Sequence, residues 1–288
     1  MLVDAATLYF RAFHALPTSL TDPQGRPNNA VRGFLDGLRV LRDAHRPDRI
    51  VACWDEDWRP QWRVDLVPTY KAHRVADGEE GGDETPDELA PQVPVIAEVL
   101  QALGIPVVGA PAMEADDVVA ALALAAQEPV DIVSGDRDLV QLVSDAAQRR
   151  LLYLGTGVGK HTVFDEAAVE AAYGVRPERY ADLAVLRGDP SDGLPGAAGI
   201  GAKTAARYLA AFGDLEGVLA AAETVAPPLT AAKATVLREA ADALRAALRV
   251  VRLQPGGLTV PEVSRDDAAL QRLGDRHGIT TALRRWDA

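Results

Sequence analysis

The sequence has a single cysteine, Cys53, and only four lysines and five histidines among its 288 residues. One cysteine cannot form a disulfide within the chain, and its strand-like surroundings favour a small buried hydrophobic side chain over a nucleophile. No apolar run reaches the ~18 residues that a membrane-spanning helix needs. The first residues also lack a basic segment followed by an apolar one, which is the pattern of a secretion signal. We therefore expect a cytoplasmic protein with no membrane partner.

Basic charge is scarce relative to acidic charge. There are 30 Lys and Arg against 42 Asp and Glu, which gives a formal net charge of −12. Nucleic-acid binding usually requires a basic surface, so the sum argues against such a partner. The distribution weakens that argument, because seven acids lie in one stretch, Asp77 to Glu88, whose composition is typical of a flexible loop. The total charge therefore leaves the question of a nucleic-acid partner open.

Five short apolar runs predict buried parallel strands. They are Met1 to Val3, Arg49 to Trp54, Ile105 to Val108, Val130 to Val133 and Arg150 to Leu154. Helical patterns separate most of them, and these run from Asn28 onward, from about Glu88 to Leu103 and from Glu114 to Gln127. Strands that alternate with helices indicate parallel crossovers. We therefore expect an α/β core that binds its ligand at the carboxyl ends of the strands.

Acidic residues follow four of these strands, and two more open the region that comes after them. The nine candidates are Asp4, Asp55, Glu114, Asp116, Asp117, Asp136, Asp138, Asp189 and Asp192. A single acid at a helix start is usually an N-cap or a partner of the helix dipole. The carboxyl ends of parallel strands meet at one edge of a sheet, however, so we expect these acids to lie close together.

Carboxylates a few ångströms apart raise one another's pKa and destabilise the fold unless a cation lies among them. Hard divalent cations with oxygen ligands are the usual solution, and the lack of nearby paired Cys or His argues against zinc. Because Mg²⁺ takes only one or two direct carboxylates, some of the nine acids must act through water. The pattern predicts phosphodiester hydrolysis by in-line displacement at two metal ions.

A site with so many carboxylates would still repel a phosphodiester, so the protein must supply cations. Arg11 lies two turns after Asp4, and Lys71 and Arg74 share one helix face. We expect these three residues to bind the scissile phosphate and Tyr70 to stack on a base. Further predicted DNA contacts are Arg32, Gly33 and Arg63. The alternative for the segment around Lys71 is a solvated helix surface.

After about Pro177 the strand patterns mostly stop, so we divide the chain into a core, residues 1–176, and a helical module, residues 177–288. Near the start of the module, Gly-x-Gly before a helix presents free backbone N–H groups to a phosphate. This segment predicts duplex contacts by Gly199, Gly201, Lys203 and Thr204. The alternative is a hairpin that only packs two helices together.

The segment Gly155 to Lys160 suggests a nucleotide phosphate loop, but two residues argue against it. Leu154 stands where the first glycine of that motif belongs, and His161 replaces its Ser or Thr. We expect a tight turn between two strands.

In chain order, these motifs closely resemble those of the bacterial 5′-nuclease (flap endonuclease) family, above all the 5′–3′ exonuclease domain of DNA polymerase I. The motifs are Leu2-Val3-Asp4, Arg11 to Leu16, Trp54-Asp55, Tyr70-Lys71-x-x-Arg74, Glu114-Ala115-Asp116-Asp117, Asp136-Arg137-Asp138-Leu139, Gly188-Asp189-x-x-Asp192-x-Leu194-Pro195-Gly196 and Gly199-Ile200-Gly201-x-Lys203-Thr204-Ala205. The resemblance covers nearly the whole chain. With no polymerase region after it, we expect a free-standing nuclease.

The resemblance implies a PIN-like parallel-sheet core, a helical arch over the active site at about residues 58–90, and a helix–hairpin–helix (H3TH) module with its hairpin at about residues 188–212. It implies two or more Mg²⁺ or Mn²⁺ ions and often a K⁺ ion at the hairpin. The implied substrates are DNA with a 5′ flap, a nick or a recessed 5′ end and RNA–DNA primer junctions, cleaved by a monomer during primer removal and repair.

The resemblance also assigns roles to the candidate residues. Glu114, Asp116, Asp136 and Asp138 correspond to the first metal site, and Asp4 and Asp55 act there largely through water. Asp117, Asp189 and Asp192 correspond to the second site. Arg11, Lys71 and Arg74 correspond to the family's phosphate-binding cations, and Tyr70 to its stacking residue.

The sequence departs from the family pattern at three places. Ala5 replaces a usual Gly, Gly193 stands where Asn is common, and the expected arch carries the acidic stretch Asp77 to Glu88. Two other functions fit parts of the pattern. A non-catalytic DNA-junction-binding homologue would be expected to have lost some of the acids, and a metal-dependent phosphatase for small molecules would leave the glycine hairpin unexplained.

Overall fold

The computed structural model describes residues 1–75 and 85–287, and its centre is a six-stranded sheet with the order β3-β2-β1-β4-β5-β6. The strands are β1 (Leu2–Asp4), β2 (Val51–Cys53), β3 (Val107–Val108), β4 (Val130–Ser134), β5 (Arg149–Tyr153) and β6 (Thr162–Phe164). The first five run parallel, and β6 pairs antiparallel with β5. The predicted strands and the parallel α/β core are confirmed. The segment from Gly155 to Lys160 joins β5 to β6, so the predicted turn between strands is confirmed too.

Side chains alternate between the two faces of the sheet, because successive residues of a strand point to opposite sides. Val3 is aligned with Ala52 and with Val133, and all three belong to one buried cluster. Leu2 is aligned with Val51, and both belong to the other cluster. The central strands are therefore covered on both faces, which explains why their sequences are continuous apolar runs.

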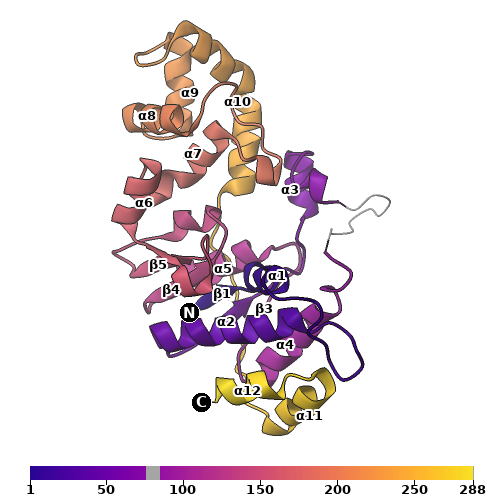
Figure 1. Cartoon of the computed structure of the whole chain (residues 1–288). Coiled ribbons are helices and arrows are strands. Elements are labelled where there is room, and N and C mark those ends of the chain that lie inside the picture. Colours follow the sequence, from indigo (N-terminus) through magenta and orange to yellow (C-terminus); the bar gives the residue numbers. More distant parts are fainter. Residues whose placement is uncertain (76–84, 288) are drawn as a thin grey trace.

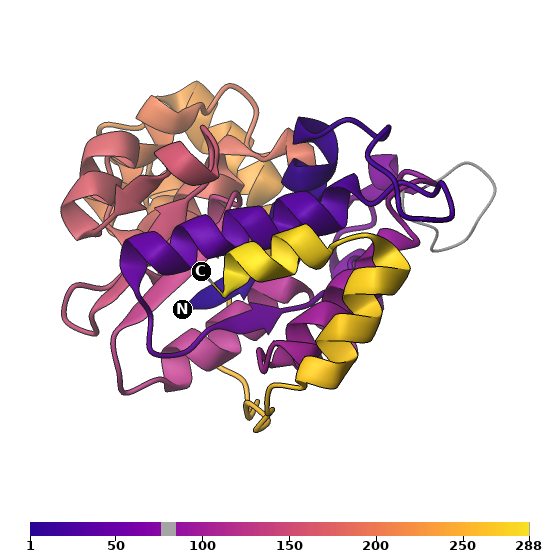
Figure 2. The same ribbon diagram turned by 60° about the horizontal axis from the view of Figure 1, so that its bottom comes forward.

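Helices cover both faces of the sheet. The cluster that contains Val3 takes in α1 (Ala5–Ala15), α2 (Asn29–His45) and α4 (Gln92–Ala102). The last two helices, α11 (Asp267–His277) and α12 (Thr280–Trp286), also pack there, with α12 along α2 and α11 against α4 (Figure 2). The opposite cluster takes in α5 (Ala115–Ala125). The three predicted helices, α2, α4 and α5, are confirmed.

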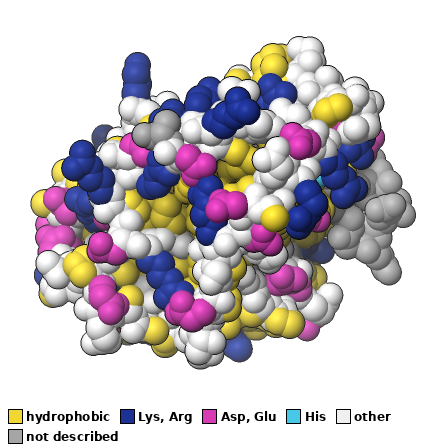
Figure 3. All heavy atoms as spheres, turned by 90° about the horizontal axis from the view of Figure 1, so that it is seen from below, with side chains coloured by type: hydrophobic (Ala, Val, Ile, Leu, Met, Phe, Trp, Pro, Cys, Tyr) yellow, Lys and Arg dark blue, Asp and Glu magenta, His cyan; other side chains and the backbone are white. Residues whose placement is uncertain are grey.

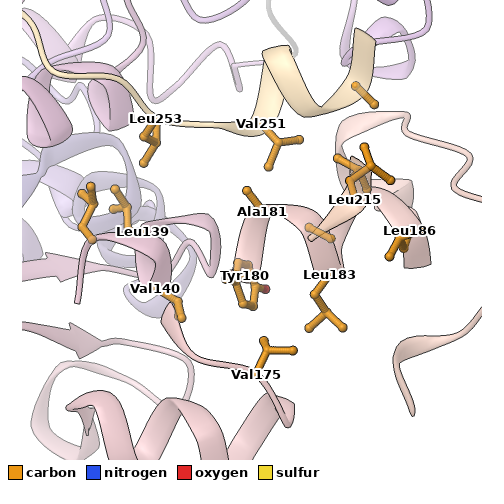
Figure 4. Close-up of a cluster of buried hydrophobic side chains, with 14 of the residues drawn as sticks. Leu139, Val140, Val175, Tyr180, Ala181, Leu183, Leu186, Leu215, Val251 and Leu253 are labelled. Carbon is orange, nitrogen blue, oxygen red and sulfur yellow. The ribbon is translucent and has the colours of Figure 1, made fainter. Parts of the chain in front are cut away.

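The remaining long helices extend from one end of the sheet (Figure 1). They are α6 (Glu166–Tyr173), α7 (Tyr180–Arg187), α8 (Ala202–Phe212), α9 (Leu215–Thr224) and α10 (Ala231–Val251). In Figure 4, Tyr180 and Leu183 of α7 lie in one cluster with Val251 of α10 and with Leu139 and Val140 of the 3₁₀ turn η2 (Asp138–Leu142). The helical module therefore shares its hydrophobic core with the sheet, and this shared core fixes the module beside the strand ends.

The arrangement in space differs from the predicted division at residues 176 and 177 in one respect. The final helices, α11 and α12, lie on the sheet and not with the helical module (Figure 1). Leu270, Leu283 and Trp286 supply the apolar surface that packs there. The chain thus leaves the core for the module and then returns.

The predicted arch, residues 58–90, is described only in part. Before the gap, the chain forms α3 (Gln61–Leu66) and the 3₁₀ turn η1 (Ala72–Arg74). Most of the acidic stretch, Asp77 to Glu84, lies outside the described residues.

Cys53 is fully buried on β2, as predicted, and burial raises the pKa of its thiol far above the ordinary value. None of the helices within residues 1–75 and 85–287 has the length and apolar character to cross a membrane.

Acidic and basic side chains alternate on the face formed by α11 and α12 (Figure 3), where Arg285 pairs with Asp36 at 3.0 Å. The acidic excess of the chain is not gathered on that face.

Two predicted DNA contacts, Arg32 and Gly33, have a packing role in the structure. The Nη2 of Arg32 donates to the carbonyl oxygens of Gly278 at 2.9 Å and Thr21 at 3.3 Å. Gly33 faces α1, and a Cβ built on it would lie 2.8 Å from the Cβ of Ala12. The missing side chain lets α1 and α2 pack closely, so both residues help to hold α2 in place.

We expect Gly33→Ala to lower the free energy of unfolding by about 1 kcal/mol, because a crowding cost of ~2 kcal/mol exceeds the ~1 kcal/mol gain in helix propensity. Gly37→Ala on the same helix is the matched control, since its Cβ would meet the flexible end of Leu8 at 3.3 Å. There the gain in propensity should dominate. Urea unfolding of both variants measures the difference, and equal stabilisation by the two changes would contradict the packing role of Gly33.

Candidate active site

Asp4 is the last residue of β1, the strand at which the order of the sheet reverses. The chain adds β2 and β3 on one side of β1 and later adds β4 and β5 on the other. Parallel sheets bind ligands at the carboxyl side of such a point. Asp4 caps α1 by accepting a hydrogen bond from the backbone N of Thr7 at 3.0 Å, and its Oδ2 accepts one from Ser134 Oγ at 2.6 Å. These bonds fix the orientation of the carboxylate at the end of β1.

A cavity of about 520 Å³ opens at this edge of the sheet. Its walls carry five of the predicted acids: Asp4, Asp55, Glu114, Asp116 and Asp136. They also carry three of the predicted cations: Arg11, Lys71 and Arg74. The strand ends therefore bring acids and bases that are far apart in sequence into one cavity.

The start of α5 brings several acids together by helix capping. Glu114 is the N-cap, and its backbone N donates to Asp117 Oδ2 at 3.1 Å. Asp55, which follows β2, accepts a hydrogen bond from the backbone N of Ala115 at 2.7 Å. This arrangement ties the end of β2 to the start of α5 and leaves Asp116 on the cavity wall.

Several of these carboxyl groups are crowded enough to titrate abnormally. Burial, and then the charge of Asp4, raise the pKa of Asp55 to about 7. Burial and the neighbouring Asp136 raise the pKa of both Asp116 and Asp138 well above the ordinary range, and burial raises the pKa of Asp136 as well. Like charges in such an environment favour a bound cation.

The donor set fits a hard divalent cation, because it consists of carboxylate oxygens in a partly buried cavity. As arranged in residues 1–75 and 85–287, no three acidic, histidine or cysteine side chains surround one point closely enough to hold an ion. An ion that keeps several of its waters needs only one or two direct carboxylates, so water would complete its coordination here.

Glu114, on the cavity wall, is bonded to three side chains. Tyr70 Oη donates to its Oε1 at 2.7 Å, Arg63 Nη1 lies 2.9 Å from Oε1, and Lys71 Nζ is bonded to Oε2. Burial disfavours the charge on Lys71, but Glu114 and then Asp192 outweigh that effect and raise the pKa of the amine. Two cations thus offset the charge of one buried carboxylate.

Burial argues against the predicted roles of Tyr70 and Arg63, and a third predicted residue, Asp117, has a structural partner. The Tyr70 side chain is 4% exposed and packs in the hydrophobic core, so its ring is not available to stack on a base. Arg63 is 3% exposed and also bonded to Val250 O at 3.2 Å, which leaves no room for a DNA contact. Both oxygens of Asp117 accept from Arg63, at 2.7 and 2.9 Å, so Asp117 braces Arg63.

Arg11 and Arg74 reach the cavity from two other segments. Arg11 lies over Gly135, where a Cβ would come within 3.4 Å of its Nη2, and it forms no hydrogen bond or ion pair with the described part of the chain. Arg74 pairs with Asp192 at 3.1 Å. Arg11 is therefore free to bind an incoming anion, whereas Arg74 links the arch segment to the helical module.

Asp189 and Asp192 border the 3₁₀ turn η5 (Pro190–Asp192) and approach the site from the helical module. Their charges contribute to the raised pKa of Asp138. Arg187 pairs with Asp189 at 3.3 Å, a cation that the sequence analysis missed although it lies only two residues away. Thr7 and Ser134, which orient Asp4, were missed too, because a hydroxyl near a strand end is too common a feature to single out.

The predicted hairpin lies between α7 and α8. Gly196 and Gly199 both have φ of +67°, a left-handed conformation that favours glycine. Gly201 is the N-cap of α8 and has no side chain to satisfy the first N–H groups of the helix, and Lys203 in the first turn is exposed. The start of α8 therefore offers free donors and a positive charge to an anion.

Comparison with known families matches residues 1–174 to the family described as 5′-3′ exonuclease, N-terminal resolvase-like domain. Residues 175–270 match 5′-3′ exonuclease, C-terminal SAM fold. The 5′-3′ exonuclease of Streptomyces coelicolor is 52% identical over 294 residues, which cover 99% of this chain and 98% of that protein. The DNA polymerase I of Mycobacterium bovis is 44% identical over 224 residues, which cover 76% of this chain and 24% of that protein. Of these two, the separate exonuclease is the more similar.

Among solved structures, that of the bacteriophage T5 D15 flap endonuclease in a pseudo-enzyme-product complex with DNA and metal ions has a TM-score of 0.69 at 19% identity. The match covers 87% of this chain and 88% of that one, and it shows a common fold. The two family matches span both the sheet and the helical module. The chain therefore belongs to the 5′-3′ exonuclease family and is a nuclease.

Proposed function

We propose that this chain hydrolyses DNA phosphodiesters at 5′ flaps, nicks and recessed 5′ ends, including RNA-primed ends, with two or more bound Mg²⁺ or Mn²⁺ ions. The observation that carries the proposal is the meeting of five acids and three cations in one cavity at the strand ends. Acids alone would repel the phosphate, and cations alone would bind it without hydrolysis. Primer removal and DNA repair are the processes that require such cleavage.

The bonds within the site suggest how the acids divide their work. Asp116 and Asp136 both lie on the cavity wall, and the charge of Asp136 raises the pKa of Asp116, so we propose that they share one ion. Asp138, Asp189 and Asp192 would serve a second. Asp4 and Asp55 already accept hydrogen bonds from the protein, which favours a role through bound water.

The cations bind and orient the substrate in this proposal. Arg11 forms no other bond in the described part of the chain and lies where it would contact a phosphate oxygen. Lys71 holds Glu114 on one side and borders the cavity on the other, so its ammonium would link that carboxylate to the phosphate. Divalent ions, when bound, would lower the pKa of the attacking water and offset the charge that develops on the phosphate.

The hairpin at the start of α8 would hold the duplex beside the cavity. Its free N–H groups and Lys203 contact backbone phosphates without reading sequence. This mode of binding fits a nuclease that recognises the structure of its substrate. The DNA and metal ions in the T5 D15 flap endonuclease structure, which has the same fold, are consistent with it.

Cleavage of a labelled 5′-flap DNA with Mg²⁺ or Mn²⁺ tests the proposal directly. We expect products from the parent protein, none with EDTA, and a loss of at least about a hundredfold in rate for Asp138→Asn. Asp275→Asn, an exposed acid on α11, is the control and should cleave normally. Duplex binding without cleavage by the parent protein would favour a non-catalytic junction-binding protein instead.

A comparison of two arginines separates substrate binding from structural support. Arg11→Met should reduce the rate of cleavage by about tenfold or more while leaving the unfolding free energy nearly unchanged, because the side chain has no partner in the described chain. Arg63→Met should lower the unfolding free energy by about 3 kcal/mol, because it leaves the carboxylates of Glu114 and Asp117 unpaired. Urea unfolding and flap cleavage measure the two effects. The assignment is wrong if Arg11→Met is the less stable variant of the two.

A further inference from the structure

The glycine hairpin is bonded to a lysine from another helix. Lys233 of α10 places its ammonium 2.7 Å from the carbonyl oxygen of Gly199 and 3.3 Å from that of Ala198. Both acceptors belong to the hairpin that precedes α8, more than thirty residues earlier in the chain. The contact therefore joins the loop to α10 by a charge-assisted hydrogen bond.

The position of Lys233 within α10 indicates that this contact matters to the hairpin. The residue lies in the first turn of the helix, where Thr230 is the N-cap and accepts from its backbone N at 3.3 Å. A cation at that end of a helix is unfavourable, because the helix dipole is positive there. No acid pairs with Lys233 in the part of the chain that the structure describes. The two hairpin carbonyls are thus the groups that stabilise its charge.

The backbone conformation of Gly199 and its lack of a side chain both favour the contact with Lys233. Its φ is +67°, and a Cβ built on it would lie 2.4 Å from Lys233 Nζ. Any other residue at this position would both strain the backbone and displace the ammonium. Glycine therefore lets two successive carbonyl oxygens turn toward a single cation.

These observations do not fit the K⁺ ion that the family resemblance predicts at the hairpin. Backbone carbonyl oxygens are the ligands that bind K⁺, but the carbonyls of Ala198 and Gly199 already hold an ammonium group. We infer that Lys233 is a tethered cation that holds the hairpin in its phosphate-binding shape, in place of an exchangeable K⁺ ion.

The inference rests on the proposed role of the hairpin in binding duplex DNA. With Ala198 and Gly199 carbonyls turned toward Lys233, the N–H groups at the start of α8 and the exposed Lys203 remain free for the phosphates. A covalently attached cation cannot be diluted or exchanged. Duplex binding should therefore respond to ionic strength but not to which monovalent cation is present.

The test measures binding of a fluorescent 5′-flap duplex by anisotropy, with Mg²⁺ present and Asp138→Asn in every protein to prevent cleavage. Each protein is titrated in KCl, NaCl and LiCl at equal ionic strength. We expect the dissociation constant of this reference protein to agree within about twofold among the three salts. Adding Lys233→Met should weaken binding roughly five- to tenfold in LiCl, with recovery in KCl because the freed carbonyls can then bind K⁺.

Two further variants serve as controls. Lys160→Met removes the same charge from an exposed residue on the turn η3 (Val158–Lys160) and should bind like the reference protein in every salt. Lys203→Gln should weaken binding by a similar factor in all three salts, because it removes a phosphate contact. Thermal unfolding of each variant shows that a loss of affinity is not a loss of folding.

A reference protein that binds about fivefold or more tightly in KCl than in LiCl would overturn the inference, since that response requires an exchangeable ion. Unchanged binding by the folded Lys233→Met variant in all salts would also overturn it. If the reference protein and Lys160→Met bind no duplex in any salt, the proposed function of the hairpin fails instead.

Discussion

At the carboxyl edge of the sheet, burial and repulsion by neighbouring carboxylates raise the pKa values of Asp116, Asp136 and Asp138. Such crowding opposes folding, because each charge loses hydration and faces like charges. The chain offsets part of this cost with Lys71 and Arg63, which neutralise the nearby Glu114. The rest of the site follows from the charge that remains, since it favours divalent ions and makes protein cations necessary for binding a phosphate.

The nine acids are consequently unequal in their surroundings. Asp4 and Asp55 are held by hydroxyl and backbone donors, Glu114 by two cations and a tyrosine, and Asp117 by Arg63. Only some carboxylates keep oxygens free for a metal ion. The bases are divided in the same way, because Arg63 supports the acids from within the core while Arg11 faces the cavity without a partner in the described chain.

Sequence patterns predicted the sheet well because its central strands are buried on both faces and give continuous apolar runs. They also predicted which acids meet, because parallel strands end at a common edge. Burial of polar residues was harder to predict. Tyr70 and Arg63 were predicted to meet the substrate, but both are buried. The carboxylates that they bond to lie at the start of α5, more than forty residues later.

The packing of the last two helices, α11 and α12, was also hard to predict from the sequence. The Ala-rich region after Pro177 gives no sign that α11 and α12 return to the sheet, since the surface that they cover is made by α2 and α4. The contact between Lys233 and the hairpin was also beyond prediction, because it depends on how α10 packs against α7 and α9 rather than on local spacing. In each case the partner is set by tertiary packing between distant segments.

The central claim is that repulsion among the buried carboxylates creates the demand for divalent ions. Urea unfolding of the parent protein and of Asp116→Asn, each with EDTA and with excess Mg²⁺, tests it most directly. We expect Asp116→Asn to be the more stable protein in EDTA, because it removes one repelling charge. Mg²⁺ at about a hundred times its dissociation constant should stabilise the parent by ~2.7 kcal/mol and the variant far less. A parent protein that is the more stable of the two in EDTA and gains nothing from Mg²⁺ would contradict the account.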